Sequence, residues 1–147
     1  MNGGEIGPLC PSAQPDWDGA SVIGIVVGTA TEPHFEHLAK PLPVTEDLLA
    51  FSKPVTPAEV FRFAAPCINH SCAQYSGSRC QLAEKVVKLL PVVATRLPSC
   101  TIRPRCRWWQ QEGKPACLRC EQVVTDNYSP SAEMRCAADP RVRPEAC

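Results

Sequence analysis

The spacing of ten cysteines restricts what this 147-residue chain can fold into more than any other feature of the sequence. Only 6% of the residues are aromatic, whereas 16 are proline, which breaks helix interiors and removes hydrogen-bond donors from sheets. We therefore expect short regular elements around a lean hydrophobic core. Such elements need further cross-links, and cysteines supply these either as disulfides or as metal ligands.

The amino-terminal sequence favours metal ligands over disulfides. Residues 1–19 contain neither the basic segment nor the apolar segment of a secretory signal peptide, so we expect a cytoplasmic, reducing compartment. In such a compartment, clustered thiols are more often metal ligands or redox centres than disulfides. No apolar run approaches the roughly 20 residues that cross a bilayer, so no membrane partner is expected.

The apolar pattern predicts a small α+β, loop-rich, metal-stabilised single domain with two or three short helices and one or two short strands. The β-branched run Ser21–Val27 is apolar on both faces, which is typical of a short buried strand. Thr56, Pro57 and Glu59 form a helix-start signal, and we expect that helix to continue to about Ala65.

A second helix is predicted over Gln81–Leu90, where leucine and valine recur at helical spacing. This helix would place Cys80 at its amino-terminal end, where free amide groups favour a thiolate. Weaker signals predict helical turns at Glu46–Phe51 and Arg107–Glu112 and a short closing strand at Gln122–Thr125.

Composition divides the chain into three parts. Residues 1–19 are rich in Gly, Pro, Asp and Ser and predict an irregular arm that carries Cys10. Residues 20–125 are predicted to be the cysteine-rich metal-cluster domain; within them, residues 32–54 contain four prolines and are expected to wrap the surface. Residues 126–147 have almost no bulky apolar side chains and predict a mobile tail.

Eight of the cysteines form two candidate ligand sets of four. The first set is Cys10, Cys67, Cys72 and Cys80, and the second is Cys100, Cys106, Cys117 and Cys120. Within the first set, His70 is an alternative to Cys10 as the fourth ligand, although a solvent-facing histidine is the simpler interpretation. Cys136 and Cys147 lie in the predicted tail and are not expected to bind metal.

Iron–sulfur ligation explains these spacings better than zinc does. A structural zinc ion, with bonds of about 2.3 Å, is usually held by two close pairs of cysteines, and only Cys117 and Cys120 form such a pair. A cubane cluster is wider, so it accepts thiolates from irregular gaps. We predict one or two iron–sulfur clusters of the 4Fe–4S type, with zinc as the alternative. The spacings differ from those of bacterial ferredoxins, plant-type ferredoxins and radical SAM enzymes, so no family is assigned.

A basic and aromatic segment coincides with the second ligand set. Arg103, Arg105 and Arg107 precede Trp108 and Trp109, although Lys plus Arg and Asp plus Glu balance at 15 each over the whole chain. We expect the indoles to exclude water from a cluster and the arginines to offset thiolate charge. A stacking platform for single-stranded nucleic acid is the alternative, which the neutral chain disfavours.

The predicted function is electron transfer or cluster carriage to a partner protein, rather than catalysis by this chain alone. One alternative is a zinc-binding adaptor that contacts protein or nucleic acid, and another is a thiol oxidoreductase that uses Cys117-x2-Cys120. The sequence contains no glycine-rich nucleotide loop, G-x-S-x-G elbow or H-E-x-x-H pair. His34 and His37 would share a face only in a helical turn, so they are expected to be surface residues.

Overall fold

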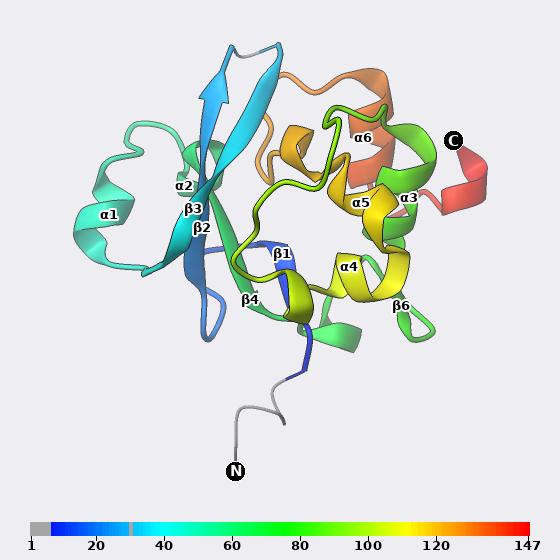
Figure 1. Cartoon of the computed structure of the whole chain (residues 1–147), viewed down its shortest axis with the longest axis horizontal. Coiled ribbons are helices and arrows are strands. Elements are labelled where there is room, and N and C mark those ends of the chain that lie inside the picture. Colours follow the sequence, from blue (N-terminus) through cyan, green and yellow to red (C-terminus); the bar gives the residue numbers. More distant parts are fainter. Residues whose placement is uncertain (1–6, 30) are drawn as a thin grey trace.

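The computed structural model describes residues 7–29 and 31–147, which form a small mixed α+β domain. In these residues there are six short α-helices and two β-sheets, one of four strands and one of two. The α+β class is as predicted, but both helices and strands outnumber the expectation. Figure 1 shows helices α3 to α6 on one side of the four-stranded sheet and α1 on the other. No helix of the described residues is long and apolar enough to span a bilayer.

The four-stranded sheet is antiparallel and has the order β1-β4-β2-β3. Its strands are β1 (Leu9–Ala13), β2 (Ser21–Gly28), β3 (Pro33–Pro43) and β4 (Phe61–Pro66). Strand β2 confirms the strand predicted from the β-branched run. Gly24 in β2 is required by close packing, because a Cβ atom there would lie 2.3 Å from the ring of Phe35.

The helices are α1 (Glu46–Ala50), α2 (Pro57–Val60), α3 (Gln81–Leu89), α4 (Arg107–Glu112), α5 (Lys114–Cys117) and α6 (Ala132–Ala138). Helices α1, α3 and α4 confirm three predicted helical segments. The small sheet pairs β5 (Tyr75–Ser76) with β6 (Arg79–Cys80) immediately before α3. Cys80 is the residue that precedes the first turn of α3, as expected.

Four predicted features are wrong. The helix expected from Pro57 to about Ala65 ends at Val60, because the following residues form the central strand β4, which pairs with both β1 and β2. The irregular arm and the surface-wrapping segment contain β1 and β3. The predicted strand Gln122–Thr125 is not a strand; it follows a 3-10 turn at Cys120–Gln122. For β1, β3 and β4, pairing within the sheet overrides the local sequence signal.

The carboxy-terminal residues also differ from the mobile tail that composition predicted. Helix α6 buries Met134 and Ala137 in the core, and a disulfide joins Cys136 to Cys147. The buried ammonium of Lys85 in α3 donates to the carbonyl oxygens of Asp139, at 2.7 Å, and Val142, at 2.8 Å. The carboxy-terminal segment therefore folds against α3.

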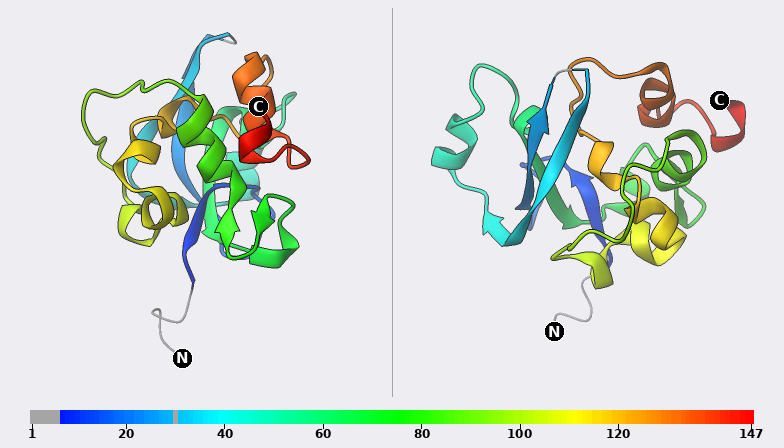
Figure 2. Two further views of the ribbon diagram at one scale, coloured as in Figure 1. Left: turned by 90° about the vertical axis from the view of Figure 1, so that its right-hand side faces the viewer. Right: turned by 45° about the horizontal axis from the view of Figure 1, so that its top comes forward.

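The sheet separates two buried clusters of apolar side chains. Val22 and Phe63 face α1 and α2, whereas Ile23 and Ala64 face the side occupied by α3 to α6. Figure 2 shows these helices stacked beside the sheet from two further directions. The cluster that includes Ile23, Ala64 and Trp108 also contains four of the eight cysteines considered below, namely Cys80, Cys100, Cys106 and Cys120. The core on this side is therefore built partly from thiols.

Candidate functional site

Site A is a cavity lined by the four cysteines of the first predicted set, Cys10, Cys67, Cys72 and Cys80. These residues come from four separate segments. Cys10 lies on β1 opposite Ala65 of β4, and Cys67 directly follows β4. The Cys67 amide donates to the Pro8 carbonyl at 2.9 Å, which extends the β1–β4 pairing to the cysteine itself. Sheet pairing therefore brings together two thiols that are far apart in the sequence.

The other two thiols of site A are placed by the short elements between β4 and α3. Cys72 ends a 3-10 turn at Asn69–Ser71, and its sulfur accepts from the Gln74 amide at 3.4 Å. Cys80 pairs with Tyr75 across the small sheet. The site therefore draws on sheet pairing, a tight turn and the start of a helix.

The remaining wall of site A is aromatic and cationic: Trp17, Tyr75, Arg107 and Trp108 also line the cavity. The Arg107 guanidinium donates to the Asn69 side-chain oxygen at 2.7 Å and lies 5.3 Å from the Tyr75 ring centroid. His70 does not line this cavity; it is exposed, and its ring lies 4.9 Å from that of Tyr75. The structure thus places Cys10, and not His70, beside the other three thiols.

Burial dominates the acid–base behaviour of site A. Burial raises the pKa of the Cys10 thiol to about 12, although the Ser12 amide donates to the sulfur and opposes this increase. Burial also raises the pKa of Cys80, against the amide groups of Ala83 and Leu82 in the first turn of α3. The expected helix amides therefore do favour the Cys80 thiolate, but desolvation is the larger effect. A positive metal centre is the kind of partner that would reverse it.

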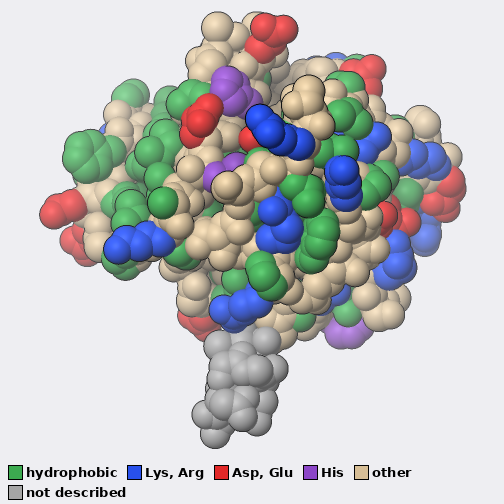
Figure 3. Space-filling model, viewed as in Figure 1, with side chains coloured by type: hydrophobic (Ala, Val, Ile, Leu, Met, Phe, Trp, Pro, Cys, Tyr) green, Lys and Arg blue, Asp and Glu red, His purple; other side chains and the backbone are tan. Residues whose placement is uncertain are grey.

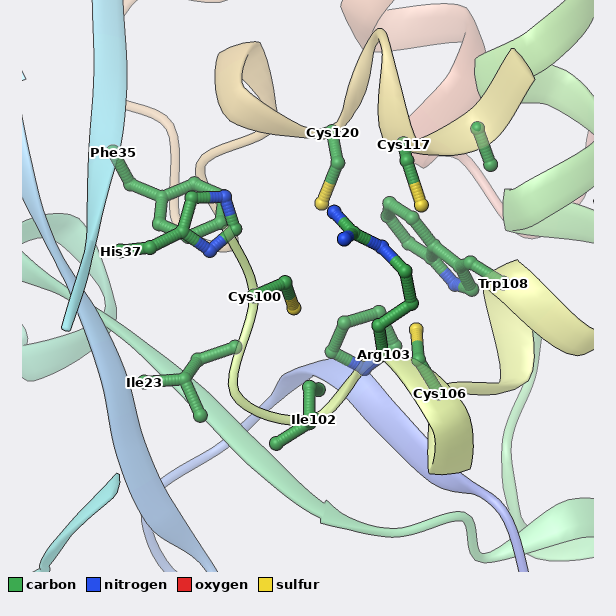
Figure 4. A pocket seen from close by; sticks show the side chains of 12 residues that line it. Ile23, Phe35, His37, Cys100, Ile102, Arg103, Cys106, Trp108, Cys117 and Cys120 are labelled. Atoms are coloured by element: carbon green, nitrogen blue, oxygen red, sulfur yellow. The ribbon is translucent and has the colours of Figure 1, made fainter. Parts of the chain in front are cut away.

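Site B is a second cavity lined by the four cysteines of the second set, Cys100, Cys106, Cys117 and Cys120 (Figure 4). Cys100 precedes a 3-10 turn at Arg103–Arg105, and Cys106 precedes the first turn of α4. Cys117 ends α5, and Cys120 begins the next 3-10 turn. A parallel bridge between Leu9 and Cys106 connects the segment of site B to β1.

The thiols of site B share the effects of burial and proximity. Burial, together with the nearby Cys120, raises the pKa of Cys106 to about 12, although the amides of Trp109 and Trp108 oppose the increase. Burial raises the pKa of Cys100 as well. Burial also raises the pKa of Cys117, against a hydrogen bond from the Arg103 side chain.

Arg62 is the most unusual residue beside site B, because its side chain is fully buried. Its guanidinium donates to the Cys120 sulfur at 3.3 Å and to the Cys120 carbonyl at 3.1 Å. It also donates to the Pro11 carbonyl at 2.8 Å and stacks 4.1 Å from the Phe35 ring centroid. In residues 7–29 and 31–147 no carboxylate forms an ion pair with it. A buried cation without an anion is costly, so thiolates at site B would compensate it.

Arg103 and His37 complete the polar surroundings of site B. In Figure 4 the Arg103 guanidinium extends between the sulfurs of Cys117 and Cys120. His37, on β3, lines the same cavity, and its buried Nε2 atom has no hydrogen-bond partner among residues 7–29 and 31–147. Burial, together with the nearby charge of Arg62, lowers the pKa of His37 to about 4. His37 is half-buried beside the thiols, whereas His34 is exposed. The two residues lie three positions apart on β3, so their side chains point to opposite faces of the sheet.

Trp108 lines both cavities and therefore lies between the two sites. Its side chain is only 1% exposed, whereas Trp109 is half-buried. The expected burial of the first indole beside the cysteines is thus present, and its face is not open for a base to stack on. The arginines of this segment separate: Arg103 reaches site B, Arg107 reaches site A and Arg105 is exposed.

Two residues that contact the sites were missed by the sequence analysis. Arg62 lies within an apolar run, Phe61-Arg62-Phe63, that was interpreted as part of a helix. A single charge flanked by aromatic residues was the signal available for it. His37 was considered only together with His34, and no local signal connects it to cysteines more than sixty positions away.

In residues 7–29 and 31–147 no three or more His, Cys, Asp or Glu side chains form a group that could hold a metal ion. Each set of four thiols instead surrounds a cavity whose other walls combine apolar and aromatic side chains with an arginine. Comparison of the chain with protein-family models, curated proteins and solved structures found no match.

Proposed function

We propose that this protein binds two iron–sulfur clusters of the 4Fe–4S type, one at each site, and serves in electron transfer or cluster carriage for a partner protein. One observation carries the proposal. Eight cysteines divide into two sets of four, and each set lines a cavity of its own. A cubane cluster needs four thiolates, and each site offers four.

The arrangement around the thiols supports a cluster over zinc. The four segments of site A approach from different directions, and no two of its cysteines are closer than five positions in the sequence. Structural zinc is usually held by closely spaced pairs of cysteines on hairpin-like turns. In site B only Cys117 and Cys120 have that spacing. Cysteine sets of mixed spacing suit the larger dimensions of a cluster.

The neighbouring groups are those that tune a cluster. Backbone amides donate to Cys10 and Cys106, and a guanidinium donates to Cys120. Hydrogen bonds to ligand sulfurs and exclusion of water are two main controls on the potential of an iron–sulfur centre. Trp17 and Trp108 provide apolar surface that excludes water. Because several of the candidate ligand cysteines belong to the hydrophobic core, metal binding would also contribute to the stability of the fold.

Anaerobic purification tests the proposal. We expect a brown protein that contains iron and acid-labile sulfide in amounts corresponding to two cubane clusters per chain. A colourless protein with stoichiometric zinc would favour the zinc-adaptor alternative. A protein without metal, whose Cys117 and Cys120 cycle between dithiol and disulfide, would favour the thiol oxidoreductase. Either of these results would overturn the iron–sulfur proposal.

A further inference from the structure

We propose that the two sites are an unequal pair, in which Arg62 and Arg103 make site B the stronger electron acceptor and Trp108 forms the wall across which an electron passes from site A. This inference rests on the proposed function, since it assigns different roles to the two sites. The inference is argued from the fixed charges and the hydrogen-bond donors that lie beside the cysteine sulfurs of each site.

The first support is the direct contact of a permanent cation with site B. Arg62 Nη2 donates to the Cys120 sulfur at 3.3 Å, and the guanidinium is excluded from water. Its remaining donors are held by the Pro11, Cys120 and Val123 carbonyl oxygens, so the charge cannot move away. A charge in such an environment is screened much less than one at the surface.

The second support is a further guanidinium in the same cavity. Arg103 lines site B, and its guanidinium extends between the sulfurs of Cys117 and Cys120 (Figure 4). Its own side chain is held by a hydrogen bond to the Pro98 carbonyl and lies 5.7 Å from the Trp109 ring centroid. Figure 3 shows several more Lys and Arg side chains across the middle of the face in front of the loops and short helices that form site B.

Site A has no equivalent contact among the described residues. Its one guanidinium, from Arg107, donates to Asn69 and stacks on Tyr75, and no hydrogen bond from it to a sulfur is present in residues 7–29 and 31–147. The donors that reach the sulfurs of site A are neutral backbone amides, from Ser12 to Cys10 and from Gln74 to Cys72. The two sites thus differ in the charge of the groups that contact their ligands.

This difference in charge determines the direction in which an electron would move between the two sites. Gaining an electron makes a thiolate-ligated centre more negative, and a nearby fixed cation stabilises the more negative state. We therefore expect one electron from a one-electron donor protein to reach site A, pass beside Trp108 to site B and leave to a one-electron acceptor protein. The electron count balances, because each site returns to its starting state and no bond or proton is exchanged.

A redox titration of the iron-loaded full chain, followed by electron paramagnetic resonance, tests the inference. We expect two reduction steps at different potentials. Arg103→Gln should lower the potential of the higher step and leave the lower step in place. Arg107→Gln is the matched control, because it removes the guanidinium of site A and should leave the higher step unchanged. Arg62→Lys keeps the buried charge but loses the fork of donors, so it should lower the higher step by a smaller shift than Arg62→Gln.

The outcomes are distinguishable. Two clusters that reduce at one common potential, or a response of the lower step alone to Arg103→Gln, would overturn the unequal pair and leave the proposed function intact. A single cluster per chain would also overturn it. A chain that takes up no iron and sulfide would remove both proposals. Arg103 is only partly buried, so its replacement keeps the test possible if the Arg62 variants fail to fold.

Discussion

The side-chain amide of Gln111 pairs with both backbone polar groups of Cys80: its oxygen accepts from the Cys80 amide at 2.8 Å, and its nitrogen donates to the Cys80 carbonyl at 2.9 Å. Gln111 thus makes the two backbone hydrogen bonds that a further strand beside β6 would make with Cys80. Because α4 follows Cys106 of site B and carries Gln111 to site A, this short helix couples the two sites.

Replacing Gln111 tests that coupling. Gln111→Ala leaves the Cys80 amide and carbonyl without partners, so the free energy of unfolding should fall by about 1–3 kcal/mol in urea denaturation. The matched control is Gln110→Ala, one position earlier, whose exposed amide donates to the Pro104 carbonyl. That variant should change stability by less than about 0.5 kcal/mol. Equal effects of the two substitutions would contradict a stabilising role for the pairing of Gln111 with the Cys80 backbone.

Substitution of single cysteines should separate ligands from the other thiols. Cys106→Ala and Cys120→Ala should each lose the iron and sulfide of one site, because three thiolates leave one iron of a cubane without its protein ligand. Cys136→Ala and Cys147→Ala should keep both clusters, since these residues form a disulfide away from the cavities. Iron and acid-labile sulfide per chain are the measurements. Comparable iron loss from the Cys136 or Cys147 variants would overturn the ligand assignment.

Removal of metal should unfold the domain. Three of the four thiols of site B, Cys100, Cys106 and Cys120, belong to the core cluster around Trp108. Without metal no ligand bonds would join the segments that carry these thiols, so the free energy that ligation contributes to folding would be lost. We expect chelation under reducing conditions to abolish the cooperative melt followed by circular dichroism, and iron with sulfide to restore it. A metal-free protein with an unchanged melt would show that the apolar core suffices.

Trp108 distinguishes a shielding role from a nucleic-acid surface. Trp108→Ala removes a fully buried indole, so stability should fall by about 3–5 kcal/mol and clusters should be lost faster in air. Trp109→Ala, at the half-buried neighbour, is the matched control and should have a smaller effect on both. Fluorescence of the loaded protein should be quenched and should recover on cluster loss. If Trp108→Ala instead keeps all iron and weakens single-stranded oligonucleotide binding by about 1–3 kcal/mol, the platform alternative is correct.

Elements with a strong local signal were predictable from the sequence. Helix α3 has regular apolar spacing, and β2 is a continuous β-branched run, so the sequence signal of each lies within its own residues. Strands β1, β3 and β4 were missed because they form by pairing with other strands and their sequences lack a pattern typical of strands. In β4 both faces are covered, so its side chains do not alternate between apolar and polar, and a helix-start signal precedes it directly.

The grouping of the cysteines followed from their spacing, but the surroundings of the sites did not. The structure brings the eight residues into the two expected sets, while their role as ligands stays a prediction. Arg62 reaches site B only because β4 lies at the centre of the sheet, and His37 only because β3 is a strand. Contacts that depend on the pairing of distant strands cannot be predicted from the pattern of neighbouring residues.

The position of α4 at both sites has a consequence for synthesis on the ribosome. A chain grows from its amino terminus, so all four cysteines of site A are made before Cys100. Arg107, Trp108 and Gln111, which close site A, emerge later. We therefore expect site A of the nascent chain to stay open to incoming iron and sulfide until α4 docks, and loading to be slower once translation has passed that helix.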